Sequence, residues 1–478
     1  MTSLVNALRT KNTVTENGMV TSSSSLSATL DLFFVIGAVR KQVKFEDGIN
    51  RLIGKFEAAR NEDALITRKL LFWARDVRGG AGEREAFRVL LRYAAKNYPQ
   101  DVIDNIDLIS EYGRWDDVFC LFNTPVEANA INLIIDNLKA KNGLLAKWMP
   151  RLGGKVPDQK KHIANKVRNA MGLTPRDYRK MLVELTNVVE TPMCAGEFDK
   201  INYEHVPSLA MSRYSKAFQT KDNARFGEYK NALASGDAKV NASAVYPYDI
   251  TKNLNYGDSA LAVEQWKSLP NFMEGSNERV LPVCDVSGSM DTTVGGNTTA
   301  MEVCISLGLY ISERNEGPFK DAFVTFSSQP KLQYLTGDLR SRYSQLHHAE
   351  WGMSTNLEAT FELILNQATK HNVSPEEMPT CILIMSDMEF NQATHPDDSA
   401  IDMIRTKYVD SGYEMPKVVF WNIVSRHDNF PVKADDKGTA LVSGFSPSIL
   451  KTVLTGNAMD PVQIMLDTLN TPRYEAVK

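Results

Sequence analysis

Apolar residues recur every three to four positions through most of the first half of the chain. This helical spacing starts at Leu30 and continues to about Leu233, and glycines or prolines such as Pro99 separate one stretch from the next. We expect helices over 62–77 and 82–96. A row of helices cannot bury its apolar faces pair by pair. The pattern therefore predicts an all-α domain of stacked, HEAT-like helical repeats, closed either as a solenoid or as a compact domain.

The pattern changes near residues 271–277. From there the chain holds short runs that are apolar throughout, at 279–284, 322–326, 381–385 and 418–424. Helical stretches lie between them, at 300–312, 357–369 and 398–408. Apolar strands that alternate with helices predict a doubly wound α/β domain, whose parallel sheet is covered on both faces. In such a fold the functional site lies at the carboxyl ends of the strands.

These changes divide the chain into an N-terminal arm (1–29), a helical-repeat domain (30–274) and an α/β domain (275–478). The arm has no amphipathic period and ends in a threonine followed by four serines, at 21–25. We expect it to be disordered, or to be ordered only by docking.

Composition restricts the class of protein. The chain has 478 residues, of which 43% are hydrophobic and 23% charged, values typical of globular proteins. Its longest apolar run, at 32–39, is too short to cross a bilayer, and residues 1–13 lack the apolar segment of a secretory signal. The five cysteines show no CxxC spacing, and we expect reduced core residues. We therefore expect a cytoplasmic protein with no membrane partner.

The two halves differ in charge. Residues 1–274 carry 38 Lys and Arg against 32 Asp and Glu, whereas residues 275–478 carry 16 against 26. The basic excess is greatest over 141–190. There, lysines and arginines that could contact phosphates and a tryptophan that could stack on unpaired bases form a candidate RNA-binding surface: Lys147, Trp148, Arg151, Lys155, Lys160, Lys161 and Arg168. An excess of six is small for a dedicated nucleic-acid-binding domain, and a solvated helix face also explains it.

A candidate metal site follows the first predicted strand. Asp285, Ser287 and Ser289 form a D-x-S-x-S turn that presents a carboxylate and two hydroxyls. Thr355 and Asp387 stand at two other strand-to-helix junctions of the predicted sheet. Hard oxygen ligands of this kind suit Mg²⁺ or another divalent cation. The alternative is an ordinary turn whose hydroxyls cap the following helix.

This pattern resembles the von Willebrand factor A domain and its metal-ion-dependent adhesion site. Helical repeats followed by such a domain are similar to the Ro autoantigen, whose TROVE module is a ring of helical repeats closed by an A domain. Several phrases are closer to an uncharacterised Ro-like family of phages, bacteria and plants, and they lie at residues 75–85, 111–117, 178–180, 206–208 and 386–390. Ro proteins bind small structured RNAs on the ring's outer surface and single-stranded RNA ends in its central hole. The resemblance implies an RNA-binding role.

Our hypothesis is a non-enzymatic, Ro-like ribonucleoprotein component. It would bind small structured or single-stranded RNA and hold Mg²⁺, with a carboxylate-bearing protein as a second partner at the metal. The alternative is a metal-dependent protein-interaction or structural module, associated with a phage or virion, that binds no nucleic acid. A metal-dependent hydrolase is a third class. The sequence offers it no HExxH motif and no base close to the five oxygen ligands.

Overall fold

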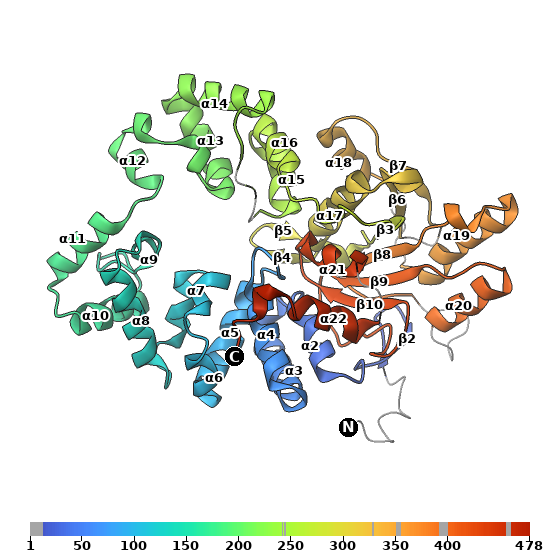
Figure 1. Ribbon diagram of the computed structural model, residues 1–478, viewed down its shortest axis with the longest axis horizontal. Coiled ribbons are helices and arrows are strands. Elements are labelled where there is room, and N and C mark those ends of the chain that lie inside the picture. The colour runs from blue at the N-terminus through green and yellow to red at the C-terminus, as the bar shows by residue number, and fades with distance from the viewer. Residues whose placement is uncertain are drawn as a thin grey trace.

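The computed structural model describes residues 13–240, 242, 245–326, 329–349, 355–391, 400–455 and 460–478 (Figure 1). Residues 1–12 of the expected arm, and residues 398 and 399 of the expected helix over 398–408, lie outside the described residues. Among the described residues, no helix is both long enough and apolar enough to cross a membrane.

The first part of the chain is helical, as the apolar spacing predicts. Its α-helices are α2 (Ala28–Ile36), α3 (Glu46–Glu62), α4 (Ala64–Arg75), α5 (Arg84–Asn97), α6 (Pro99–Ile103), α7 (Leu108–Tyr112), α8 (Glu127–Lys139), α9 (Gly143–Trp148), α10 (Asp158–Ala170), α11 (Pro175–Leu185), α12 (Glu190–Ala195), α13 (Ser208–Lys221), α14 (Asn223–Ser235), α15 (Pro247–Tyr256) and α16 (Ser259–Lys267). The 3-10 segments are η1 (Gln42–Lys44), η2 (Trp115–Leu121), η3 (Phe198–Lys200) and η4 (Tyr203–His205). Pro99 begins α6, where its fixed φ and missing N–H cost nothing.

The C-terminal part holds a six-stranded mixed sheet. Its strands are β3 (Val280–Cys284), β6 (Ala322–Thr325), β7 (Leu332–Tyr334), β8 (Cys381–Ser386), β9 (Lys417–Asn422) and β10 (Thr439–Ser443). Its helices are α17 (Ala300–Arg314), α18 (Leu339–His347), α19 (Leu357–His371), α20 (Ala400–Asp410), α21 (Leu450–Thr455) and α22 (Pro461–Leu469). A small hairpin, β4 (Thr293–Gly295) with β5 (Thr298–Thr299), precedes α17.

The sheet corrects the sequence prediction at both edges. The strand order is β10-β9-β8-β3-β6-β7, and all neighbours are parallel except β6 and β7, which are antiparallel. The expected wholly parallel sheet is therefore wrong for its last strand. Neither β7 nor β10 was among the predicted strands. The two end residues of β7 are exposed, so it carries no apolar run that the sequence could reveal.

The order of the strands identifies the edge where a site can form. From β3 the chain moves outward through β6 to β7, and it then returns to the other side of β3 to build β8, β9 and β10. The direction of winding therefore reverses between β3 and β8. The loops that follow two such strands diverge to opposite faces and leave a crevice at their carboxyl ends. Residues that follow β3 and β8 are the first candidates for function.

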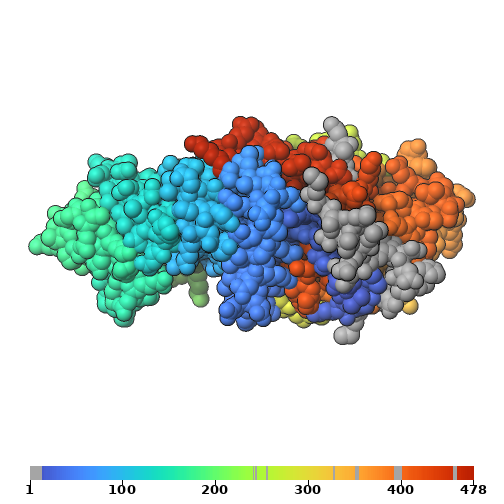
Figure 2. Space-filling view, turned by 90° about the horizontal axis from the view of Figure 1, so that it is seen from below, coloured from blue at the N-terminus to red at the C-terminus, as the bar shows by residue number. Residues whose placement is uncertain are grey.

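The helical part returns to the sheet domain at both of its ends. At one end α2 packs against β10 and α22, and at the other α15 packs against α17. Trp266 of α16 donates to Glu313 of α17 at 2.9 Å, and Arg314 donates to the Trp266 carbonyl at 2.9 Å. The chain therefore forms a closed ring, which Figure 1 shows face-on. Figure 2, turned by 90°, shows the same ring edge-on as a flat body.

One hydrophobic core runs through both parts. It extends without interruption from the buried residues of α2 to those of the sheet and α22. A second, smaller core lies within α13, α14 and the segments next to them. Three of the five cysteines are buried, and all five are free thiols. Cys194 corrects the expectation of core cysteines, because its side chain is exposed on α12.

Described residues of the arm lie against the sheet domain. Residues Thr13–Val14 (β1) pair with Val20–Thr21 (β2) in a short antiparallel hairpin. Gly18 bridges to Asn391, and Ser22 bridges to Phe430. The arm thus contacts loops at the carboxyl edge of the sheet.

The C-terminus is fixed to the helical part through one buried carboxylate. Asp76, directly after α4, accepts hydrogen bonds from Arg473 and from the Tyr474 hydroxyl, the latter at 3.0 Å. Its side chain is fully buried. A buried carboxylate needs partners to offset its lost hydration. These contacts therefore hold the C-terminal segment against the helical part.

We therefore expect Asp76→Ala to lower the free energy of unfolding by about 2–4 kcal/mol, because it strands the Arg473 guanidinium. Denaturant unfolding measures the change, and limited proteolysis near residue 470 should become faster. Arg84→Ala is the control. It removes an exposed pair with Glu85 at 2.8 Å and should cost no more than about 0.5 kcal/mol. Equal stability of the two variants would contradict the assignment.

Candidate metal centre

Asp285 is the first residue after β3, and its carboxylate is buried within the turn that follows. Its Oδ1 accepts the Ser287 N–H at 2.9 Å, and its Oδ2 accepts the Ser386 hydroxyl at 2.6 Å. The hydroxyls of Ser287 and Ser289 are 2.9 Å apart. The D-x-S-x-S turn thus gathers its three oxygen-bearing side chains as the alternation in the sequence suggests.

Asp387 reaches the same place from the neighbouring strand. It follows β8, which is the strand paired with β3, and its side chain is fully buried. Its Oδ1 accepts the Glu389 N–H at 3.3 Å. Its Oδ2 has no hydrogen-bond partner among the described residues. A buried carboxylate oxygen that accepts no hydrogen bond is costly, so this atom is a candidate position for a cation.

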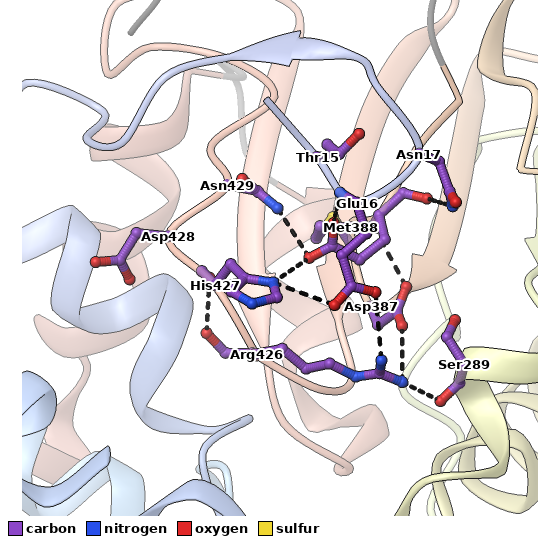
Figure 3. Close-up of polar contacts among 12 residues, drawn as sticks. Thr15, Glu16, Asn17, Ser289, Asp387, Met388, Arg426, His427, Asp428 and Asn429 are labelled. Atoms are coloured by element: carbon purple, nitrogen blue, oxygen red, sulfur yellow. Dashed lines mark hydrogen bonds and ion pairs between the residues drawn. The ribbon is translucent and has the colours of Figure 1, made fainter. Parts of the chain in front are cut away.

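Arg426 supplies one positive charge beside these carboxylates. It lies in the loop after β9, and Figure 3 shows its side chain extending beneath Asp387 towards Ser289. Its Nη2 is 3.5 Å from Asp387 Oδ2, and it donates to the Ser289 carbonyl and to the Thr292 hydroxyl. The 3.5 Å separation is longer than a charge-assisted hydrogen bond, so the guanidinium balances the carboxylates only in part.

The two carboxylates of the site have raised pKa values. Burial and, after it, the nearby Asp285 carboxylate raise the pKa of Asp387 to about 7. Burial also raises the pKa of Asp285. Two carboxylates with raised pKa values have too little positive charge near them, even with Arg426 present. A divalent cation would add to that charge.

Thr355 lies beside this cluster but faces the next loop. Its hydroxyl donates to the Glu389 carbonyl at 2.7 Å and is 3.0 Å from Asn391 Oδ1. Its hydroxyl is thus linked to Asp387 through Glu389. The structure gives it no direct contact with Asp285, so its role as a fifth ligand stays a prediction.

The described residues contain no group of three or more His, Cys, Asp and Glu side chains with the geometry of a metal site. The candidate site here instead combines two carboxylates with serine hydroxyls. The orphan oxygen of Asp387, the paired Ser287 and Ser289 hydroxyls and the buried Asp285 fit the oxygen set that Mg²⁺ takes. Asp285, Ser287, Ser289 and Asp387 are the residues that would hold it.

A buried glutamate and an exposed histidine complete the surroundings of the site. Glu389 is 1% exposed, and its Oε1 is 3.0 Å from His427 Nδ1 and accepts from Asn429 at 2.8 Å. Sequence reasoning found neither Arg426 nor His427. The signal was available, because residues 425–428 directly follow an apolar strand run and so stand at the same sheet edge. His427 is also a base that the sequence argument against a hydrolase did not take into account.

The candidate RNA-binding residues divide into two groups. Arg151 donates to the Ala146 carbonyl and to Thr186, and Arg168 donates to the Leu173 carbonyl at 2.7 Å, so both support helix ends. Trp148 is covered on one face, because the Arg114 guanidinium lies 4.2 Å from its ring centroid.

The lysines of this set are more accessible. Lys147 is 3.6 Å from Glu190, and Lys161 is 3.2 Å from the exposed Asp158. Lys155 and Lys160 are exposed. They lie at and just before α10, on the arc of the ring farthest from the sheet (Figure 1). The surface available to a polyanion therefore centres on these lysines.

We expect Asp387→Asn to stabilise the metal-free protein at pH 8 by about 1–3 kcal/mol. A raised carboxylate pKa means that the native state favours the protonated form, so the wild type loses stability as the pH rises from about 4 to about 7. The variant lacks that loss. Thermal unfolding with EDTA and with increasing Mg²⁺ measures both effects, and Mg²⁺ should raise the midpoint of the wild type alone.

Asp291→Asn is the matched control, because its side chain is exposed in the same loop. It should keep the Mg²⁺ response and the pH dependence. A wild type that Mg²⁺ leaves unchanged would rule out the metal site.

Comparison with known proteins gives three findings. Residues 15–118 and 147–278 match a domain of unknown function, DUF2828, and residues 279–473 match a domain of unknown function, DUF7788. Uncharacterized protein L728 of Acanthamoeba polyphaga mimivirus is 30% identical over 95% of this chain and 86% of its own. The crystal structure of the RO (RSR) protein of Deinococcus radiodurans aligns with 92% of this chain and 99% of its own, at 15% identity and a TM-score of 0.47. The chain therefore belongs to the same family as the mimivirus protein, and most of it matches these two domains of unknown function.

Proposed function

We propose that this chain is a non-enzymatic, RNA-binding protein with a Mg²⁺-dependent ligand site in its sheet domain. The observation that carries the metal site is the orphan Oδ2 of Asp387, buried beside Asp285 at the point where the strand order reverses. Neutral hydroxyls from Ser287 and Ser289 would leave much of the cation's charge free, so an acidic group of a protein partner could complete its coordination.

The RNA-binding part rests on the exposed lysines around α10 and on the sequence resemblance to Ro proteins. Lys155 and Lys160 reach solvent, and Lys161 contacts the exposed Asp158 and the Gly154 carbonyl. Phosphates would displace such weak surface pairs easily. The sheet domain carries the acidic excess, so we place RNA binding on the helical part.

A protein-interaction module without RNA is the main alternative. The same metal site would then serve a structural role. The arginines of the helical part favour this alternative, because they pair with aspartates of the protein. Arg75 and Arg88 pair with Asp117 at 2.8 and 2.6 Å, and Arg114 pairs with Asp116 at 2.9 Å. These cations stabilise packing between helices and are not available to phosphates.

To test RNA binding, we expect the Lys155→Ala, Lys160→Ala double variant to weaken the affinity for a single-stranded or stem-loop RNA. Each lost phosphate contact should reduce the slope of log K against log salt by about 0.7–0.9. Filter binding or fluorescence anisotropy between ~50 and ~200 mM salt measures it. The Lys320→Ala, Lys370→Ala double variant removes the same charge from exposed positions of the sheet domain and should bind as the wild type does.

Asp285→Ala separates the two proposed activities. It should abolish the Mg²⁺ response and leave RNA affinity unchanged, because Asp285 lies in the acidic domain. No RNA binding by the wild type at ~50 mM salt would favour the protein-interaction module.

A hydrolase is a second candidate because His427 is held by the buried Glu389 at 3.0 Å, close to Asp387. A carboxylate that orients an imidazole is a common arrangement for a general base. This candidate predicts Mg²⁺-dependent hydrolysis of an RNA or an aryl phosphate ester that falls at least about 100-fold in His427→Ala. The His371→Ala variant, altered at an exposed histidine on α19, should keep the rate. No turnover by the wild type would exclude it.

A further inference from the structure

We propose that the loops beside the metal centre form a binding site for an acidic turn of a protein partner, and that the chain's own Thr15–Asn17, the turn between β1 and β2, fills this site as a resident ligand. The site consists of the 389–391 segment after β8 and the 426–430 loop after β9. It deepens the proposed function by naming the ligand class, and it rests on that proposal only in placing a protein partner at this face.

The backbone and side chains of this arm segment are held by polar contacts. Thr15 donates its hydroxyl to the Phe390 carbonyl at 2.5 Å, and the Glu16 N–H donates to Glu389 Oε2 at 2.6 Å. Asn17 donates its side-chain amide to the Glu389 carbonyl at 2.6 Å. The turn at the tip of the hairpin thus contacts two main-chain carbonyls and one carboxylate of the segment that follows β8.

The Glu16 carboxylate faces the Arg426 guanidinium and the His427 ring. Its Oε2 is 3.5 Å from Arg426 Nη1, and its Oε1 is 3.8 Å from His427 Nδ1. Figure 3 shows the three side chains converging above the loop. Within the acidic sheet domain, the Arg426 guanidinium favours a negative side chain at this position of the bound turn.

The same guanidinium links this ligand to the metal centre. Arg426 contacts Glu16 through Nη1, and it contacts Asp387 and Ser289 through Nη2. Asn17 Nδ2 is 3.5 Å from the Thr355 hydroxyl. The arm segment therefore covers the side of the candidate metal centre that a partner would approach.

The arm has a fixed base and a weakly held tip. Its base is anchored where Thr21 donates to the Phe430 carbonyl at 2.7 Å and where Ser25 accepts from Ala434 at 2.9 Å. At the tip, Glu16 is 46% exposed, and the hairpin has only two residues in each strand. Such short hairpins are marginal alone, so the tip can be displaced while the base stays attached.

A tethered tip competes strongly with a peptide in solution. Because it is attached at the anchored base, its effective concentration at the site is of order millimolar. We therefore expect weak binding of a free peptide to the wild type, and stronger binding once the contacts of the tip are removed.

The probe is a fluorescent peptide with the sequence of residues 13–22. We expect its affinity for the full-length Glu16→Ala, Asn17→Ala variant to exceed that for the wild type at least tenfold in fluorescence anisotropy titrations. A second peptide, with glutamine in place of its glutamate, should bind this variant several-fold less tightly. Val14→Ala is the matched control, since that side chain is 60% exposed in the same arm, and it should bind as the wild type does.

Each titration is made in EDTA and again in Mg²⁺. Equal affinity of the wild type and the double variant would overturn the resident-ligand proposal, and equal affinity of the two peptides would overturn the acidic ligand class. Failure of the metal proposal appears separately, as the absence of a Mg²⁺ effect on thermal unfolding. The peptide contacts involve Arg426, His427 and main-chain groups, so they can be measured without the metal.

Discussion

The packing of α2 between the sheet and the other helices is the constraint on which the rest of the structure depends. Every residue of α2 after Ala28 is buried. Its last carbonyls, which have no partner within the helix, accept hydrogen bonds from the ends of the strands: Ser443 donates to Phe33 at 2.6 Å, and Asn422 donates to Phe34 at 3.3 Å. A buried helix end needs such partners. Gly37 permits the approach, because a Cβ there would lie 2.7 Å from the Ser443 hydroxyl oxygen.

This packing also positions the loop that serves the site. Arg51 of α3 donates to the Arg426 and Ser425 carbonyls at 2.5 and 2.8 Å. Lys55 of the same helix pairs with Asp428 at 3.2 Å. The helical part thus fixes the backbone from which Arg426 and His427 extend. The two parts of the chain act as one body, and a change in the packing of α3 would alter the charge balance at Asp387.

The candidate site combines high buried charge with incomplete compensation. Asp285 and Asp387 come from adjacent parallel strands, and the fold forces their carboxylates together. One guanidinium shared among Asp387, Ser289 and Glu16 cannot neutralise both. Burial and the neighbouring Asp285 carboxylate raise the pKa of Asp387, and the shortage of positive charge is the physical reason to expect a cation at this edge.

The sequence alone determined the elements and half of the site. Helical spacing and wholly apolar runs predicted the helical part and four strands, since burial on one or both faces leaves a direct record in residue type. The turn after β3 and the aspartate after β8 followed from the rule that function gathers at strand ends. Only the tertiary structure decided the antiparallel β7, which has no apolar signal, and the contact between the arm and Glu389, whose partners stand more than 370 positions apart. It also decided which groups hold the arginines, because the sequence does not reveal that Arg75 pairs with Asp117, Arg114 with Asp116 and Arg151 with Thr186.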